Sequence, residues 1–139
     1  MICHICITVS DLEKSTNFYN SILAPLGYHK VLEFPNAVGF GNQGKPSFWI
    51  GTAPPGEYWK EGHEAGRSPI HFAFQSQTNE AVDAFHKLGL ELGAEDYGAP
   101  GLREHYHSHY YGAFLIDPDG NNIEAVCHGP SNGAVVDVS

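Results

Sequence analysis

Residues 117–126, with the sequence DPDGNNIEAV, join a tight turn to an apolar strand that carries a single acidic residue. Pro118 fixes its own φ and Gly120 tolerates a positive φ, so the first four residues favour a turn. A strand is therefore predicted over residues 121–127. Since side chains alternate along a strand, Glu124 points away from the more apolar face. Charged residues are mostly solvated, so an exposed glutamate is the ordinary interpretation, and a functional carboxylate is the alternative.

The length and charge of the chain limit the class of protein. With 139 residues, 42% of them hydrophobic, the chain is long enough for one domain with its own core and short for two. Sixteen acidic and seven basic residues give a formal net charge of -9. This charge repels phosphate backbones and anionic lipids, so nucleic acids and membrane surfaces are unfavourable partners. We expect the partner to be a small molecule or another copy of the chain.

The cysteines and the first residues indicate a compartment. No apolar run approaches the roughly 20 residues of a membrane span. The start, MICHICITV, lacks the basic region of a signal peptide. Three cysteines, Cys3, Cys6 and Cys127, make an odd number within apparent strands, which favours reduced and mostly buried thiols. We therefore expect a cytoplasmic protein.

The first half of the chain reads as a strand, a helix and three further strands. Alternating apolar residues predict the first strand over residues 3–9. The sequence SDLE that follows is a capping box, so a helix should begin at Ser10 and end at Pro25 and Gly27. Glycines, prolines and asparagines then divide the chain into short strands. These are expected at residues 29–33, 37–40 and 47–50.

The second half repeats this order. A strand is predicted over residues 70–74 and a helix, capped by Thr78, over residues 79–92. A loop at 97–102 and strands at 112–116 and 121–127 complete the half. His4 and Phe18 are fourteen positions apart, and so are His71 and Phe85, so the halves look like copies offset by 67 residues.

We expect a single domain over residues 1–139, formed by two modules. Module one covers 1–51 and module two covers 70–128, with a linker at 52–69 and a tail at 129–139. The linker is rich in glycine and proline, and its Tyr58 and Trp59 could close over a ligand or pack on a neighbouring surface. The helices should cover one face of each sheet, over these residues: Ile5, Ile7, Phe72 and Phe74.

Three residues of metal-ligand type fall at matching places in the two halves. His4 and His71 each lie on the less apolar face of a first strand, and Glu124 lies on a last strand. A single histidine at a strand start is more often structural, but its repetition beside a carboxylate favours a metal site. Two imidazoles and one carboxylate can hold Fe(II) or a similar divalent metal, and they also suit catalytic zinc. The expected class is therefore α+β, with two tandem βαβββ modules forming a curled mixed sheet around a metal-binding cavity.

Both ends of the chain resemble a known family. The start at residues 4–9, HICITV, followed by Ser15 and Phe18-Tyr19, resembles the glyoxalase signature, and the DPDG turn with Glu124 resembles the carboxyl-terminal signature. The chain up to His128 thus resembles the vicinal-oxygen-chelate superfamily of glyoxalases, extradiol dioxygenases and bleomycin- or fosfomycin-resistance proteins. The resemblance implies a divalent metal, Fe2+, Zn2+, Ni2+ or Mn2+, and a homodimer whose site lies within one chain or is shared by swapped chains.

The resemblance implies more than one reaction. Glyoxalases usually take a fourth ligand from the last strand of the first half, and here that strand reads SFWI, residues 47–50. Extradiol dioxygenases carry a histidine before the acidic strand, which His107 matches, and a phenol where this chain has Phe114. Tyr110 or Tyr111 would have to supply that phenol. We expect dioxygenase-like chemistry, with glyoxalase (lactoylglutathione lyase)-like isomerisation or non-catalytic binding of a small molecule, as in antibiotic resistance, as the alternatives.

Residues 103–111, with the sequence REHYHSHYY, supply the candidate catalytic side chains. They offer a base that is neutral near pH 7, phenol donors and a cation for a substrate anion. In a strand, the alternating histidines would present one face to the cavity; a hydrogen-bonded surface loop is the alternative. The candidates are His107, His109, Tyr111 and Arg103.

Overall fold

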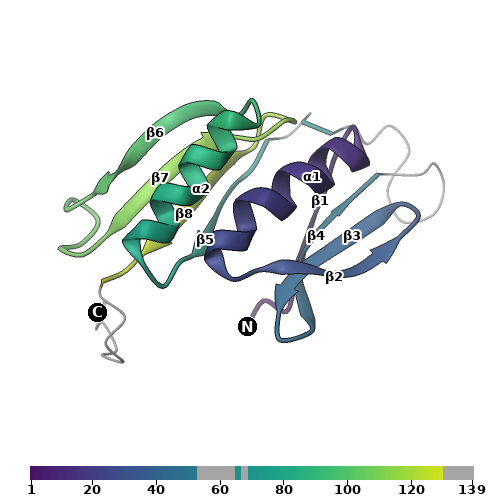
Figure 1. The fold of residues 1–139 in the computed structure, drawn as a ribbon, viewed down its shortest axis with the longest axis horizontal. Coiled ribbons are helices and arrows are strands. Elements are labelled where there is room, and N and C mark those ends of the chain that lie inside the picture. The colour runs from purple at the N-terminus through teal and green to yellow at the C-terminus, as the bar shows by residue number, and fades with distance from the viewer. Residues whose placement is uncertain (53–64, 67–68, 130–139) are drawn as a thin grey trace. The chain divides into compact units, whose positions relative to one another are not determined.

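The computed structural model describes residues 1–52, 65–66 and 69–129 (Figure 1). The chain divides into two compact units, Met1–Pro69 and Ile70–Ser139. Tyr58 and Trp59, which the sequence places in a ligand lid or a packing anchor, lie outside the described residues, and so does most of the expected tail. None of the described helices is long and apolar enough to cross a membrane.

The described residues of the first unit form a four-stranded sheet and one main helix. Its strands follow the order β1-β4-β3-β2, with β1 parallel to β4 and the other neighbours antiparallel. The elements are β1 (Ile5–Thr8), α1 (Leu12–Leu23), the short 3-10 helix η1 (Ala24–Leu26), β2 (His29–Phe34), β3 (Ala37–Asn42) and β4 (Lys45–Gly51).

The second unit repeats this topology. Its sheet has the order β5-β8-β7-β6, and β5 is again parallel to its neighbour β8. The elements are β5 (His71–Gln75), α2 (Asn79–Glu91), β6 (Glu95–Leu102), β7 (Tyr111–Ile116) and β8 (Asn122–Cys127). Two tandem βαβββ modules are thus confirmed, each with its own four-stranded sheet. The cavity that both sheets would share stays a prediction.

The strand register supports the internal repeat residue by residue. In the first unit Cys6 is paired with Trp49 across β1 and β4. In the second unit Ala73, which is 67 positions after Cys6, is paired with Glu124 across β5 and β8. Trp49 therefore occupies in the first module the place that Glu124 occupies in the second.

Three details of the sequence interpretation are wrong. The N-cap of α1 is Asp11, whose carboxylate accepts a hydrogen bond from the Lys14 backbone N–H at 3.0 Å, rather than Ser10. Aspartate and serine cap helices about equally well, so the sequence did not discriminate between neighbours. Of the three thiols only that of Cys127 is buried. Cys3 precedes β1, and Cys6 alternates along β1 with the buried Ile7 and so points to the other face.

The expected loop at 97–102 is instead part of strand β6. Its glycines and proline read as turn residues, but β6 pairs with β7 through two register shifts. Such irregularities accommodate glycine and proline at the edge of a sheet, and β6 is an edge strand.

Helix α2 covers one face of the second sheet and lies across β7 and β8 (Figure 1). Ile123, Ala125 and Leu115 on this face are fully buried. Gly89 of α2 makes the close approach possible, because a Cβ at this position would lie 2.2 Å from Leu115 Cδ1. Alternation along β8 places Glu124 on the other face, which we call the face opposite α2.

Candidate functional site

Glu124 is a buried acid in the middle of the second sheet. Only 2% of its surface is exposed. Its strand neighbours are Ala73 of β5 and Phe114 of β7, so it lies in the middle of the sheet on the face opposite α2. A buried carboxylate is costly unless hydrogen bonds or a cation compensate it. The partners of its two oxygens therefore define the candidate site.

One oxygen of Glu124 is held by a tyrosine. The Tyr110 hydroxyl donates a hydrogen bond to Oε1. Burial, together with this hydrogen bond and the carboxylate charge, raises the pKa of Tyr110 far above its usual value of 10. Tyr110 therefore stays a neutral phenol and a donor. Gly112 leaves room for this contact, since a Cβ there would lie 3.1 Å from Oε1 and 3.2 Å from Tyr110 Cε1.

The other oxygen of Glu124 faces a histidine. His71 Nε2 lies 3.3 Å from Glu124 Oε2. On the far side of the ring, Nδ1 lies 3.0 Å from the backbone carbonyl oxygen of Asn122. A carbonyl oxygen only accepts, so Nδ1 carries a hydrogen. In a neutral imidazole Nε2 then presents its lone pair to a carboxylate oxygen, and only a proton or a metal cation between the two atoms relieves that repulsion.

The same geometry fits a metal ion. Two ligands that each lie about 2.0–2.2 Å from one ion are roughly 3 Å apart, close to the His71–Glu124 separation. A backbone acceptor on the second ring nitrogen is also the usual way in which a metal-binding histidine is oriented. Within the part of the chain that the structure describes, no three His, Cys, Asp or Glu side chains gather around one point. His71 and Glu124 thus lie close enough to be candidate ligands of one ion, and metal binding by this pair and by His4 stays a prediction.

His4 lies in the first unit, just before β1, and is exposed. Its Nδ1 is 3.4 Å from Cys3 Sγ. Trp49, at the place equivalent to Glu124, stacks on Phe34 with ring centroids 6.1 Å apart. The first module therefore repeats the histidine position of the second module and replaces its carboxylate with an indole.

Asn122 adds an unsatisfied acceptor beside the pair. Two residues before Glu124, its side chain lies on the same face of β8. Its Oδ1 is buried, and no described residue donates a hydrogen bond to it. An unpaired buried acceptor costs free energy, so a donor from a ligand or from water is expected here.

The segment between β6 and β7 forms turns, and the interpretation of its histidines as a strand is wrong. The Arg103 N–H donates to the Tyr110 carbonyl oxygen at 2.7 Å, which closes the segment at its base. His107 Nδ1 accepts from the His109 backbone N–H at 3.3 Å, and His107 Nε2 lies 2.9 Å from His128 Nδ1. The rings of His107 and His128 each pack edge-to-face against the Tyr110 ring. They thus pack around the phenol that contacts Glu124.

The four candidate catalytic residues lie in different surroundings. Tyr111 points to the helix side, where its hydroxyl donates to Asp83 of α2 at 2.6 Å. His109 is exposed, and His107 is engaged with His128. Arg103 lies over the Phe114 ring, with Cζ 5.5 Å from the centroid. Of these four residues, Arg103 contacts Phe114 on the face that carries Glu124. His107 reaches this face through Tyr110.

Sequence reasoning placed Tyr111, and not Tyr110, among the candidate catalytic residues, although it allowed either tyrosine to supply the phenol. It did not consider His128 or Asn122 as functional residues. A signal for Tyr110 was present. Counting back in steps of two from Phe114, which pairs with Glu124, passes Gly112 and reaches Tyr110 on the same face. The intervening glycine leaves that path to the carboxylate clear.

Comparison with known proteins gives the family. A glyoxalase/bleomycin resistance protein from Albidiferax ferrireducens T118 has a TM-score of 0.69 and 31% identity, over 89% of this chain and 95% of that chain. A glyoxalase/bleomycin resistance protein/dioxygenase family enzyme from Burkholderia phytofirmans PsJN has a TM-score of 0.63 and 20% identity, over 91% and 98%.

A lactoylglutathione lyase from Agrobacterium tumefaciens shares the fold, with a TM-score of 0.64 and 19% identity over 91% of this chain and 92% of that chain. Among curated protein sequences none matches significantly. The model of the Glyoxalase/Bleomycin resistance protein/Dioxygenase superfamily matches residues 1–125. The chain belongs to this superfamily.

Proposed function

We propose that this chain is a metal-dependent enzyme that acts on a small substrate with two adjacent oxygen atoms, by dioxygenase-like chemistry. The observation that carries the proposal is the position of the His71 ring between the Asn122 carbonyl oxygen and Glu124. Because its Nδ1 donates to the Asn122 carbonyl oxygen, its Nε2 lone pair is directed at a buried carboxylate 3.3 Å away. A divalent cation satisfies both groups at once.

The proposed protein ligands are His4, His71 and Glu124, and the candidate ions are Fe2+, Zn2+, Ni2+ and Mn2+. Imidazole and carboxylate ligands suit all four ions, so the side chains alone do not select one. When bound, the metal would supply Lewis-acid polarisation of the substrate oxygens or activation of O₂.

The surrounding residues would orient the ligands and the substrate. Tyr110, as a permanent donor, holds one oxygen of Glu124 and leaves Oε2 directed toward His71. The unpaired Oδ1 of Asn122 can accept a hydrogen bond from a substrate hydroxyl. Phe114 stacks on the His71 ring, with centroids 6.1 Å apart and an interplanar angle of 24°, and limits its rotation.

The preference for oxygen-dependent chemistry rests on Trp49. An indole cannot act as a fourth metal ligand, and it occupies the place equivalent to Glu124. Three protein ligands leave more open positions than four, enough for a bidentate substrate and for O₂. Glyoxalase-like isomerisation, in which a fourth ligand assists, is the alternative enzyme function, and non-catalytic binding of a small molecule is the third candidate.

Metal binding is the first test. Protein purified without added metal should contain about one equivalent of divalent metal, and His4→Ala, His71→Ala and Glu124→Gln should each lower it to a similar extent. His29→Ala, which removes an exposed histidine of β2, is the matched control. Wild-type protein that binds none of the four ions would favour the non-catalytic binding protein.

The reaction is tested separately. The Fe2+ form, prepared without oxygen, should bind catechol and consume O₂ when it is admitted, and His107→Ala should slow turnover more than His63→Ala. His63 lies outside the described residues. Isomerisation of the methylglyoxal–glutathione hemithioacetal by the Zn2+ or Ni2+ form, with no oxygen uptake on any diol, would establish the glyoxalase alternative instead.

The superfamily resemblance also supports a homodimer in which each site lies within one chain or is shared by two. Sedimentation at micromolar concentration should give twice the mass of the chain. A mixture of His4→Ala and Glu124→Gln proteins distinguishes the two arrangements, because only a shared site would recover metal binding in mixed dimers. A monomeric mass would refute the assembly and leave the ligand set untouched.

A further inference from the structure

We propose that Arg103 binds an anionic group of the substrate, so that the substrate is an organic anion, with a carboxylate as the simplest case. This inference rests on the proposed function, because the anion would be held beside the His71–Glu124 pair. Four observations on Arg103 support it. No acidic side chain among the described residues pairs with it, and backbone carbonyls hold its guanidinium. It also lies on the sheet face of Glu124, and its backbone is hydrogen-bonded to Tyr110.

Among the described residues, Arg103 has no acidic partner. The ion pairs of the described residues join Lys30 to Glu33, His71 to Glu124 and His86 to Asp96, and none includes Arg103. This is notable in a chain with a formal net charge of -9, where acidic residues outnumber basic ones by sixteen to seven. A guanidinium is always charged, so its charge is available to a ligand.

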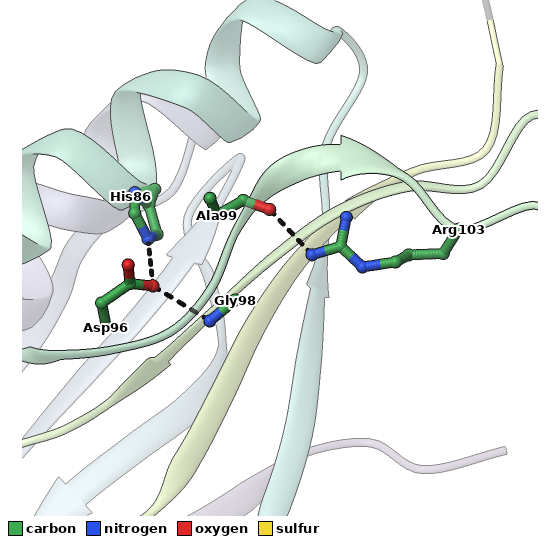
Figure 2. A network of polar contacts seen from close by, with 5 residues as sticks. All are labelled: His86, Asp96, Gly98, Ala99 and Arg103. Carbon is green, nitrogen blue, oxygen red and sulfur yellow. Dashed lines mark hydrogen bonds and ion pairs between the residues drawn. The ribbon is translucent and has the colours of Figure 1, made fainter.

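The guanidinium is held in place by backbone carbonyls. One terminal nitrogen donates to the Gly101 oxygen at 2.8 Å and the other to the Ala99 oxygen at 2.7 Å. Figure 2 shows the side chain running back along β6 to Ala99. A Cβ at Gly98 or at Gly101 would lie 3.3 Å or 3.2 Å from these nitrogens, so the two glycines leave space for the group. These bonds use two of five N–H donors, and an anion can take others.

Arg103 lies on the same face of the second sheet as His71 and Glu124. Its guanidinium covers Phe114, the strand partner of Glu124, and Phe114 in turn stacks on His71. Neighbouring strands are about 4.8 Å apart, so two spacings, roughly 10 Å, separate β8 from β6. A ligand with one ring or a short chain can span this distance.

The turn segment between β6 and β7 connects Arg103 to Tyr110. The Arg103 backbone N–H donates to the carbonyl oxygen of Tyr110, whose hydroxyl contacts Glu124. The cation and the phenol are thus presented by the two ends of one turn segment. A ligand that carries adjacent oxygens at one end and an anion at the other, with an apolar middle, matches this arrangement.

The test compares two probes that differ by one negative charge. In calorimetric titrations of the metal-loaded protein, 3,4-dihydroxybenzoate should bind at least about 10-fold more tightly than catechol, because hydrogen bonds to charged groups are the stronger ones. Arg103→Met should abolish this preference, and Arg103→Lys should retain part of it. Lys87→Gln, which removes one positive charge from an exposed position on α2, should leave the preference intact.

The outcomes separate a ligand-binding role from a structural one. If Arg103 only stabilises the turn, Arg103→Met will weaken catechol and 3,4-dihydroxybenzoate equally, and the inference is overturned. Equal affinity of the wild-type protein for both probes also overturns it. Benzoate, which carries the carboxylate without the two hydroxyls, separates failure of this inference from failure of the proposed function. If benzoate binding depends on Arg103 while neither diol depends on Glu124, the anion site is retained and the metal-dependent function fails.

Discussion

The Tyr110 hydroxyl donates a hydrogen bond to Glu124, a carboxylate of which only 2% is exposed. The opposite carboxylate oxygen lies 3.3 Å from His71 Nε2. The two oxygens of Glu124 therefore have different partners. Oε1 accepts a hydrogen bond from the neutral Tyr110 phenol, and Oε2 is available to a cation, either a proton or a metal ion.

Tyr110→Phe should weaken both the fold and metal binding. The substitution leaves a buried carboxylate oxygen without a donor, which costs about 1–3 kcal/mol in the free energy of unfolding. Loss of a group that orients a metal ligand typically weakens metal affinity by about 10- to 100-fold. Urea denaturation of the metal-free protein and a competitive chelator titration measure the two effects.

Tyr106→Phe is the matched control for Tyr110→Phe. The Tyr106 ring packs against the Tyr110 ring with centroids 4.8 Å apart, but 59% of Tyr106 is exposed. Removal of its hydroxyl should change neither quantity. Metal affinity that stays at the wild-type value in Tyr110→Phe would show that the phenol does not orient Glu124.

Gly112→Ala should disturb the contact between Tyr110 and Glu124 by placing a methyl group against it. The added methyl would lie 3.1 Å from Glu124 Oε1 and 3.2 Å from Tyr110 Cε1, so one of the two side chains must shift. We expect metal affinity to fall about as far as in Tyr110→Phe. In the double variant the losses should not add, because both substitutions remove one interaction. Additive losses in the chelator titration would refute a common cause.

The sequence predicted the repeat because the first strand of each half alternates and is followed by an amphipathic helix. It predicted most other strands because glycines, prolines and asparagines separate them. Glu124 and His71 were recognised because an acidic residue and a histidine stand out at strand positions. The strand β6 was missed because its glycines and proline resemble a turn when read locally. Only pairing with β7, a long-range contact, makes them part of a sheet.

The contacts of residues 103–110 could not be predicted from the sequence, because these residues form a turn segment in which side-chain directions follow no regular period. The sequence indicated which side chains were chemically capable and favoured Tyr111 over Tyr110, but it did not give the direction of either side chain. Tyr110 precedes β7 on the face of Glu124, whereas Tyr111 begins β7 and faces α2. One step along a strand reverses the side on which a residue acts.

Tyr111 should titrate at high pH because of Asp83. The hydrogen bond to the Asp83 carboxylate, with burial and the negative charge, raises the pKa of Tyr111 to about 12 from its usual 10. Since the folded pKa is the higher one, the bond stabilises the protein fully below pH 10, and this contribution is lost as the pH rises toward 12.

The measurement for Tyr111 is an ultraviolet titration of tyrosine ionisation. One phenol that ionises near pH 12 in the wild-type protein should ionise closer to pH 10 in Asp83→Asn. Tyr111→Phe should remove this step from the curve. Because Tyr111 faces α2, neither variant should change metal affinity, and a marked loss of metal in Tyr111→Phe would return this residue to the site.

Asp96 should make the protein sensitive to acid. A hydrogen bond from His86 Nε2 at 3.0 Å, then one from the Gly98 backbone N–H, lower the pKa of Asp96 below its usual 3.8 (Figure 2). Because the folded pKa is the lower one, the carboxylate stabilises the protein above pH 3.8, and the contribution disappears as the pH falls below that value.

Asp96→Asn should therefore destabilise the protein at pH 6 and progressively less below about pH 4, where the wild-type carboxylate takes up its proton. Urea denaturation at several pH values from 6 to about 3 measures the difference in the free energy of unfolding between the two proteins. Glu95→Gln is the control, because it removes the adjacent exposed carboxylate, for which the described residues offer no hydrogen bond. His86 lies on α2 and Asp96 on β6, so the bond ties the helix to the edge strand. A difference between wild type and Asp96→Asn that stays constant across this pH range would show that the ionised carboxylate does not hold α2 to β6.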